Sequence, residues 1–137
     1  MTFTTFIRTY LGQKVDFDRA HGYQCVDLFR QYCQDVLDTE HTGPVESAKD
    51  LFLQYENNPT MQRYFNITHE SELADYDKGD VLVWGKTDSN PHGHVAILVS
   101  IYNTKYFIVL EQDGFKQDGV KLAFRSRQGL LGCLWRK

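Results

Sequence analysis

Apolar residues recur every three or four positions along three stretches in the first half of the chain, which is the spacing of one face of an α-helix. The pattern predicts helices over residues 4–11, 25–37 and, more roughly, 48–55. Gly12 can end the first helix. A loop rich in Asp and Gly, residues 16–22, separates the first two helices, and we expect the second to be the central one.

The second half contains short runs of β-branched and aromatic residues bounded by turn residues, a pattern typical of strands. The predicted strands cover residues 80–84, 94–102 and 105–113, and two further runs, 119–124 and 132–136, are expected to complete the sheet. Helices first and strands afterwards predict an α+β fold, with N-terminal helices packed on an antiparallel β-sheet.

The 137 residues are 42% hydrophobic, and 15 basic against 18 acidic side chains give a net charge of −3. A chain of this length buries about two thirds of its unfolded surface, so we expect one domain, residues 1–137. No basic run exceeds Arg136–Lys137, so no binding to nucleic acid is expected. The longest apolar stretch, residues 95–110, is interrupted at residues 103–105, so no membrane insertion is expected.

The three cysteines form neither a disulfide framework nor a CxxC metal motif. Cys25 stands at the predicted start of the second helix, where unpaired backbone amides and the helix dipole favour a thiolate. That position is typical of a nucleophile, but a small buried hydrophobic residue remains an alternative for Cys25. Cys33 falls on the apolar face of the helix and, like Cys133, is expected in the core.

The hairpin between the second and third predicted strands brings a histidine close to an acid. If Asn103 and Thr104 form a two-residue turn, His94 lies opposite Asp113 and one diagonal step from Glu111, with all three on one face. Either acid can then accept a hydrogen bond from one ring nitrogen. A register slip of one residue would destroy this arrangement.

A cysteine at a helix start, a histidine at a strand start and an acid at a strand end together favour nucleophilic catalysis. The histidine takes the thiol proton and later gives it to the leaving amine. Structural roles stay open for each residue alone. A zinc site is a further alternative, because His92 and His94 would point to one face of a strand and could bind the metal with Cys25.

Four segments carry a resemblance to a known family. They read GYQCVDLFRQY (22–32), KGDVLVWG (78–85), GHVAILVS (93–100) and VLEQDG (109–114). In sequence, order and spacing they resemble the CHAP family, the cysteine, histidine-dependent amidohydrolases/peptidases. The resemblance covers about residues 15–115. It implies a papain-like fold and peptidoglycan hydrolysis, as in bacteriophage lysins and bacterial autolysins.

Carried over residue by residue, the resemblance implies that Cys25 is the nucleophile, His94 the general base and Glu111 the acid that orients it. The fourth family position is usually Asn, but here it is Asp113. A carboxylate cannot donate the hydrogen bonds of an amide, so the role of Asp113 is left open. Gln24 is a candidate to polarise the scissile carbonyl beside the backbone amide of Cys25.

Three carboxylates precede or follow the cysteine closely: Asp16, Asp18 and Asp27. Hard oxygen ligands suit calcium, and some phage-lysin CHAP domains bind calcium with this pattern. By that resemblance, the carbonyls of Ala20 and Gly22 would complete the site. The alternative is a solvated acidic loop in which Asp27 is a first-turn helix acid.

The expected function is therefore that of an endolysin-type enzyme that cleaves an amide bond of peptidoglycan through a thioacyl-enzyme. The resemblance implies accumulation in the host bacterial cytoplasm, without a signal peptide, until holin lesions give access to the wall. We expect wall binding to come from a domain or subunit outside this chain or from the substrate groove itself. Two alternatives are a non-catalytic virion or wall-binding module and a papain-like thiol acyltransferase. The sequence leaves open which amide bond is cleaved.

Overall fold

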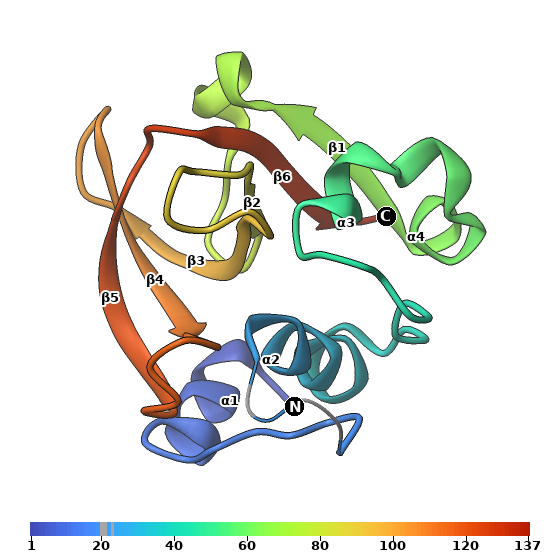
Figure 1. Ribbon diagram of the computed structural model, residues 1–137, viewed down its shortest axis with the longest axis vertical. Helices are drawn as coiled ribbons and strands as arrows, with labels where there is room; N and C mark the ends of the chain where they lie inside the picture. Colours follow the sequence, from blue (N-terminus) through green and yellow to red (C-terminus); the bar gives the residue numbers. More distant parts are fainter. Residues whose placement is uncertain (20–21, 23) are drawn as a thin grey trace.

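The fold consists of a six-stranded antiparallel sheet and helical segments that, for the most part, precede it in the chain (Figure 1). The computed structural model describes residues 1–19, 22 and 24–137. The helical elements are α1 (Phe3–Tyr10), α2 (Cys25–Tyr32), η1 (Cys33–Leu37), α3 (Asp50–Leu53), η2 (Tyr55–Asn57), α4 (Pro59–Tyr64) and η3 (Glu70–Asp75). The strands are β1 (Phe65–His69), β2 (Val81–Trp84), β3 (His94–Ile101), β4 (Tyr106–Gln112), β5 (Val120–Ser126) and β6 (Leu130–Arg136), in the sheet order β1-β6-β2-β3-β4-β5. This is the predicted α+β architecture.

The first two predicted helices are present at their predicted positions. Thr2 caps α1 by accepting a hydrogen bond from the amide of Thr5. The second helix continues from α2 into one turn of π-helix, η1, and ends where Asp38 adopts a left-handed conformation with φ 52°. The third predicted helix is reduced to the short α3, because the chain passes at once into η2.

Five strands match predicted runs, but β1 is absent from the predictions. It has five residues, FNITH, whose polar content gives no clear alternation. Its partner β6 defines it, through pairs such as Ile67 with Leu134. A side chain at Gly132 would place its Cβ 2.2 Å from the carbonyl oxygen of Thr68 and 2.6 Å from the ring of Phe52. Glycine at this position therefore permits β1, β6 and α3 to meet.

The core has two parts, and α2 belongs to the larger one. That part joins α1 and α2 to the sheet, and α2 lies against β3 and β4. Cys33 is fully buried there, and Cys133 is fully buried in the smaller part, as predicted for both. In the described part of the chain, no helix has the length and apolar character needed to cross a membrane.

Candidate active site

Cys25 is the first residue of α2 and lies partly exposed in a cleft of about 840 Å³. Gln24, His94 and Asp113 line the same cleft, together with residues 41–48. The start of the helix is fixed by Asp27, whose carboxylate accepts a hydrogen bond of 3.0 Å from the backbone amide of Gln24. The thiol is therefore held at a helix N-terminus, where the dipole favours negative charge on sulfur.

His94 is the first residue of β3, and Gly93 makes its position possible. Gly93 has φ +71°, and a Cβ there would lie 2.3 Å from the carbonyl oxygen of Trp84. The close approach pairs His94 with Trp84 across the two strands, with their ring centroids 5.9 Å apart. The side chain of His94 is 12% exposed, so one end of the imidazole reaches the cleft while most of the ring is buried.

At the site, the β3–β4 hairpin has the predicted strand register, but its turn and the course of β3 differ from the prediction. Tyr102 donates a backbone hydrogen bond to Tyr106, so the turn has three residues instead of two. The register then shifts between Leu98 and Ser100, where Val99 is an extra, bulged residue. The extra residue of the turn and the bulged residue offset each other. Ile97 therefore pairs with Leu110, as it would after a two-residue turn without a bulge.

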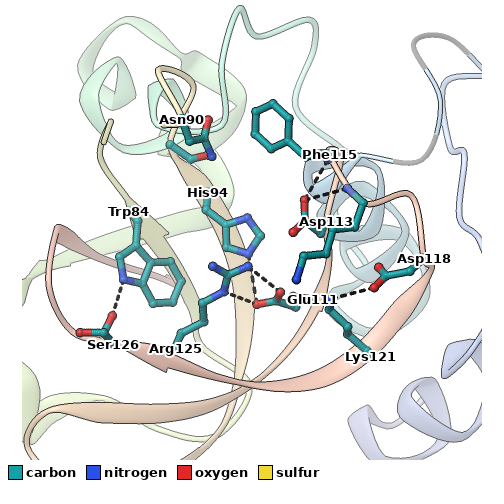
Figure 2. Close-up of polar contacts among 12 residues, drawn as sticks. Trp84, Asn90, His94, Glu111, Asp113, Phe115, Asp118, Lys121, Arg125 and Ser126 are labelled. Carbon is teal, nitrogen blue, oxygen red and sulfur yellow. Dashed lines mark hydrogen bonds and ion pairs between the residues drawn. The ribbon is translucent and has the colours of Figure 1, made fainter. Parts of the chain in front are cut away.

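Glu111 contacts both His94 and a second cation, Arg125 of β5 (Figure 2). Its Oε1 is 3.3 Å from Nε2 of His94. Arg125 donates two hydrogen bonds of 2.6 Å, from Nε to Oε1 and from Nη2 to Oε2. The carboxylate is 1% exposed, so these partners compensate for its burial. The arrangement fixes which ring nitrogen of His94 faces the acid.

The two partners shift the pKa values of His94 and Glu111 in opposite directions. Burial alone lowers the pKa of His94, but hydrogen bonds to Cys25 and Glu111, with their charges, raise it to about 9. Burial alone raises the pKa of Glu111, but the hydrogen bonds and charges of His94 and Arg125 lower it to about 2. At neutral pH, this favours a protonated imidazole beside an ionised carboxylate.

Sequence reasoning missed two residues of the site, Arg125 and Gln112. Arg125 follows the predicted strand 119–124 directly, and its partner lies 14 positions earlier in the chain. Gln112 is a fully buried amide that follows Glu111 at the end of β4. A polar residue at an inward-facing strand position was the available signal for Gln112. Only the strand pairing discloses the role of Arg125.

Asp113 lines the cleft, but its carboxylate participates in a turn. Its Oδ1 accepts hydrogen bonds from the backbone amides of Phe115 at 2.8 Å and Lys116 at 3.4 Å. Figure 2 shows Asp113 and the exposed Phe115 beside His94. A catalytic role for Asp113 stays a prediction. Gln24 also lines the cleft, which is compatible with the predicted role in binding the oxyanion.

Asp16 and Asp18, in the loop before α2, come together with Asp27 in the first turn of that helix. Ligand oxygens from the three carboxylates lie within 4.8 Å of one another. Among the described residues, Oδ1 of Asp16 is buried and has no hydrogen-bond partner. Burial raises the pKa of Asp27 to about 6, with a further contribution from the nearby charge of Asp18, although the hydrogen bond from the backbone amide of Gln24 lowers it. Arg30 balances part of the charge, since its Nη1 is 3.2 Å from Asp18 and 3.9 Å from Asp27.

These oxygens therefore fit a hard divalent cation, which would engage the buried oxygen of Asp16 and relieve the repulsion among the carboxylates. Gly22 of the predicted ligand set has φ +77°. Ala20, the other predicted backbone ligand, lies outside the described residues. Calcium itself stays a prediction.

The histidine pair offers no zinc site in the described part of the chain. There, the three aspartates are the one group of His, Cys, Asp and Glu side chains that could hold a metal. His92 instead forms a hydrogen bond of 2.9 Å between its Nδ1 and the hydroxyl of Ser47. This contact attaches the loop before β3 to the segment that leads into α3.

Comparisons with known proteins identify the family. The CHAP domain model matches residues 15–113. Endolysin PlyTW of Staphylococcus phage Twort is 28% identical, over 80% of this chain and 23% of its own length. The chain thus spans about a quarter of that relative.

Solved structures share the fold. The endolysin LysIME-EF1 superposes with a TM-score of 0.73 at 20% identity, over 96% of this chain and 61% of that one. Ly7917 superposes with a TM-score of 0.70 at 19% identity, over 99% of this chain and 62% of that one. The α+β fold is thus papain-like, as the resemblance implied. With a family match across most of its length and this fold, the chain belongs to the CHAP domain family.

Proposed function

We propose that this protein is a peptidoglycan hydrolase that cleaves an amide bond with Cys25 as nucleophile, His94 as general acid and base, and Glu111 as the orienting acid. One observation carries the proposal: a thiol at a helix start shares a cleft with a histidine, and Nε2 of that histidine contacts a buried carboxylate. A thiol nucleophile requires this combination of groups. The endolysin relatives support bacterial cell wall as the substrate.

In the proposed mechanism, His94 already holds the proton of the Cys25 thiol, as its raised pKa favours, and the thiolate sulfur bonds to the carbonyl carbon. The oxyanion is stabilised by the backbone amide of Cys25 and, in this proposal, by the side chain of Gln24. The C–N bond then breaks, and His94 protonates the departing amine. Water attacks the thioester, gives its proton to His94, and releases the acid as the thiol is restored.

The shape around the site supports a division of the substrate between two hollows. The cleft that contains Cys25 would hold the acyl half. A smaller hollow of about 500 Å³ adjoins it at His94 and is lined by Trp84, Arg125 and Ser126, but not by Cys25. Because His94 must protonate the amine that leaves, the second hollow would hold the amine half.

We further propose that Asp16, Asp18 and Asp27, with the carbonyls of Ala20 and Gly22, hold calcium. A bound cation would supply positive charge that holds the three carboxylates together. Asp27 also fixes the start of α2 through Gln24, so its orientation bears directly on the placement of Cys25.

The proposed setting is a phage endolysin that accumulates in the host cytoplasm and acts on the wall after holin-dependent release. Recognition of the wall is then shared with a domain or subunit outside the chain. The length of the matched relative supports this, since most of it lies beyond the region of similarity.

The test is digestion of purified cell walls by the wild type and by Cys25→Ala, followed by mass spectrometry of the products. Wild-type digests should gain equal numbers of free amino and carboxyl termini, which also identify the bond. Cys25→Ala should release nothing, whereas Cys133→Ala, which removes a buried thiol outside the cleft, should remain active. Products joined by new amide bonds would establish transfer instead of hydrolysis. Binding to the wall without any products would establish a non-catalytic module.

A further inference from the structure

Adjacent residues at the end of β4 serve the two halves of the site. Successive side chains of a strand point to opposite faces. Glu111 points toward His94 and Arg125. Gln112, the next residue, points toward the chain that precedes Cys25 and is fully buried.

The amide of Gln112 makes three hydrogen bonds, all to backbone groups. Its Oε1 accepts from the amide of Val15 at 2.8 Å. Its Nε2 donates to the carbonyl of Val15 at 2.7 Å and to the carbonyl of Gln24 at 2.9 Å. Both donors and one acceptor site of the side chain are thus used. Glutamate would lack the donors, asparagine would be one methylene too short, and methionine would offer neither donors nor a comparable acceptor.

The three bonds close a loop at its base. Val15 and Gln24 are the two ends of the 15–24 loop, which carries two of the clustered aspartates and leads directly into Cys25. A backbone pairing holds the chain just before this loop: Gly12 donates to the carbonyl of Val120 and Val120 donates to that of Gln13, each at 2.8 Å. From Val15 onward, the Gln112 side chain provides the hydrogen bonds that hold the chain, first at Val15 and then at Gln24.

We propose that Gln112 is a positioning residue that holds both ends of the 15–24 loop on β4 and thereby sets the placement of Cys25 relative to His94. The inference deepens the proposed function, since it assumes that Cys25 is the nucleophile. β4 is the common reference for both groups: Glu111 aligns the imidazole and Gln112 aligns the backbone from which the thiol projects.

The test compares the rate of Cys25 alkylation by iodoacetamide, at one near-neutral pH, in the full chain of the wild type, Gln112→Met and Gln112→Glu. Labelling is read at Cys25 by peptide mass spectrometry. Both variants should be alkylated at least about tenfold more slowly than the wild type, because the thiol is no longer held in its place relative to His94. On cell walls, kcat should fall in the same proportion and KM should change little.

A control separates positioning from stability. Leu98→Val alters a fully buried residue in the other part of the core, so it should lower the melting temperature without changing the alkylation rate. The proposal is overturned if Gln112→Met behaves like this control, or if Gln112→Glu keeps the wild-type alkylation rate without the Nε2 donors. Should Gln112→Met fail to fold, Gln112→Asn, which retains an amide, replaces it under the same criteria.

The alkylation measurement also distinguishes this inference from the proposed function. If the wild type digests no wall but its rate of Cys25 alkylation depends on Gln112, the hydrolase is contradicted and the positioning role is supported. If the wild type is active but its rate of Cys25 alkylation does not depend on Gln112, the hydrolase is supported and the positioning role is contradicted.

Discussion

Glu111 carries most of the electrostatic organisation of the site. A carboxylate that is 1% exposed is stable in its charged form only when its partners replace the lost water. Here Arg125 provides two hydrogen bonds and His94 provides one. Because Arg125 holds both oxygens, the carboxylate cannot turn away from the imidazole.

Replacing Arg125 by Met should impair catalysis while leaving Cys25, His94 and Glu111 in place. The loss should be between about tenfold and a hundredfold in kcat, as is typical when a group that orients a catalytic side chain is removed. Steady-state wall digestion measures it. The matched control is Lys121→Met on the same strand, where the ion pair with the half-exposed Asp118 contributes little. Equal losses in both variants would contradict a specific role for Arg125.

The pair of His94 and Glu111 should stabilise the fold within a defined pH window. The pKa of His94 is raised from 6.5 to about 9, so its contribution is complete below pH 6.5 and is lost as the pH rises through 9. The pKa of Glu111 is lowered from 4.5 to about 2, so its contribution is complete above pH 4.5 and is lost as the pH falls through 2.

The difference in melting temperature between the wild type and Glu111→Gln should therefore be greatest between pH 4.5 and 6.5. Subtracting the variant removes the contributions of other titrating groups, such as Asp27 and Asp80, to a first approximation. Thermal melts across the pH range measure it. A difference that stays constant with pH would contradict the coupling.

At the scale of elements, the β3–β4 hairpin delivers the histidine and the acid to one place. The bulge at Val99 absorbs the extra residue of the three-residue turn. The chain therefore keeps the same pairing at the catalytic end that a shorter, regular hairpin would give. What the bulge adds is local twist and bending of β3.

Deletion of Val99 should leave the catalytic register intact, because Leu98 can pair with Val109 and Ser100 with Ile108 as they already do. We expect a folded protein that keeps at least about a tenth of its activity, the loss arising from altered twist. Deletion of Ala96 should abolish activity, because it turns His94 to the opposite face. Circular dichroism and wall digestion test both; an inactive Val99 deletion with native-like structure would show that the bend itself positions His94.

At the scale of the whole molecule, the acidic cluster connects the loop before α2 to overall stability. If calcium binds only the folded state, it stabilises that state by roughly 2.7 kcal/mol at a hundredfold excess over Kd. The melting temperature should rise with calcium and fall with EDTA. Asp16→Asn/Asp18→Asn should lose the response, whereas Asp88→Asn, an exposed aspartate outside the cluster, should keep it.

Isothermal titration of the metal-free wild type supplies the direct measurement of that binding. Absence of both a binding heat and a calcium-dependent melting shift would leave Arg30 as the cation that holds Asp18 and Asp27. That result would not affect the assignment of Cys25.

The sequence by itself determined the α+β class, the helix start at Cys25, the burial of Cys33 and Cys133, and five of the six strands. These features depend on local periodicity, which neighbouring residues alone specify. Its motifs also sufficed to place the chain in its family. The hairpin register at His94 was predicted correctly although the turn was not, because the bulge at Val99 offsets the extra residue of the turn.

Only the tertiary structure decided the rest. Arg125 and Gln112 reach partners on other elements, Glu111 in one case and Val15 with Gln24 in the other, and no spacing along the chain encodes such contacts. Strand β1 exists because β6 offers it a free edge. The turn of Asp113 and the clustering of the aspartates likewise depend on how separate segments pack. Long-range packing decided these features because each requires partners that local sequence cannot supply.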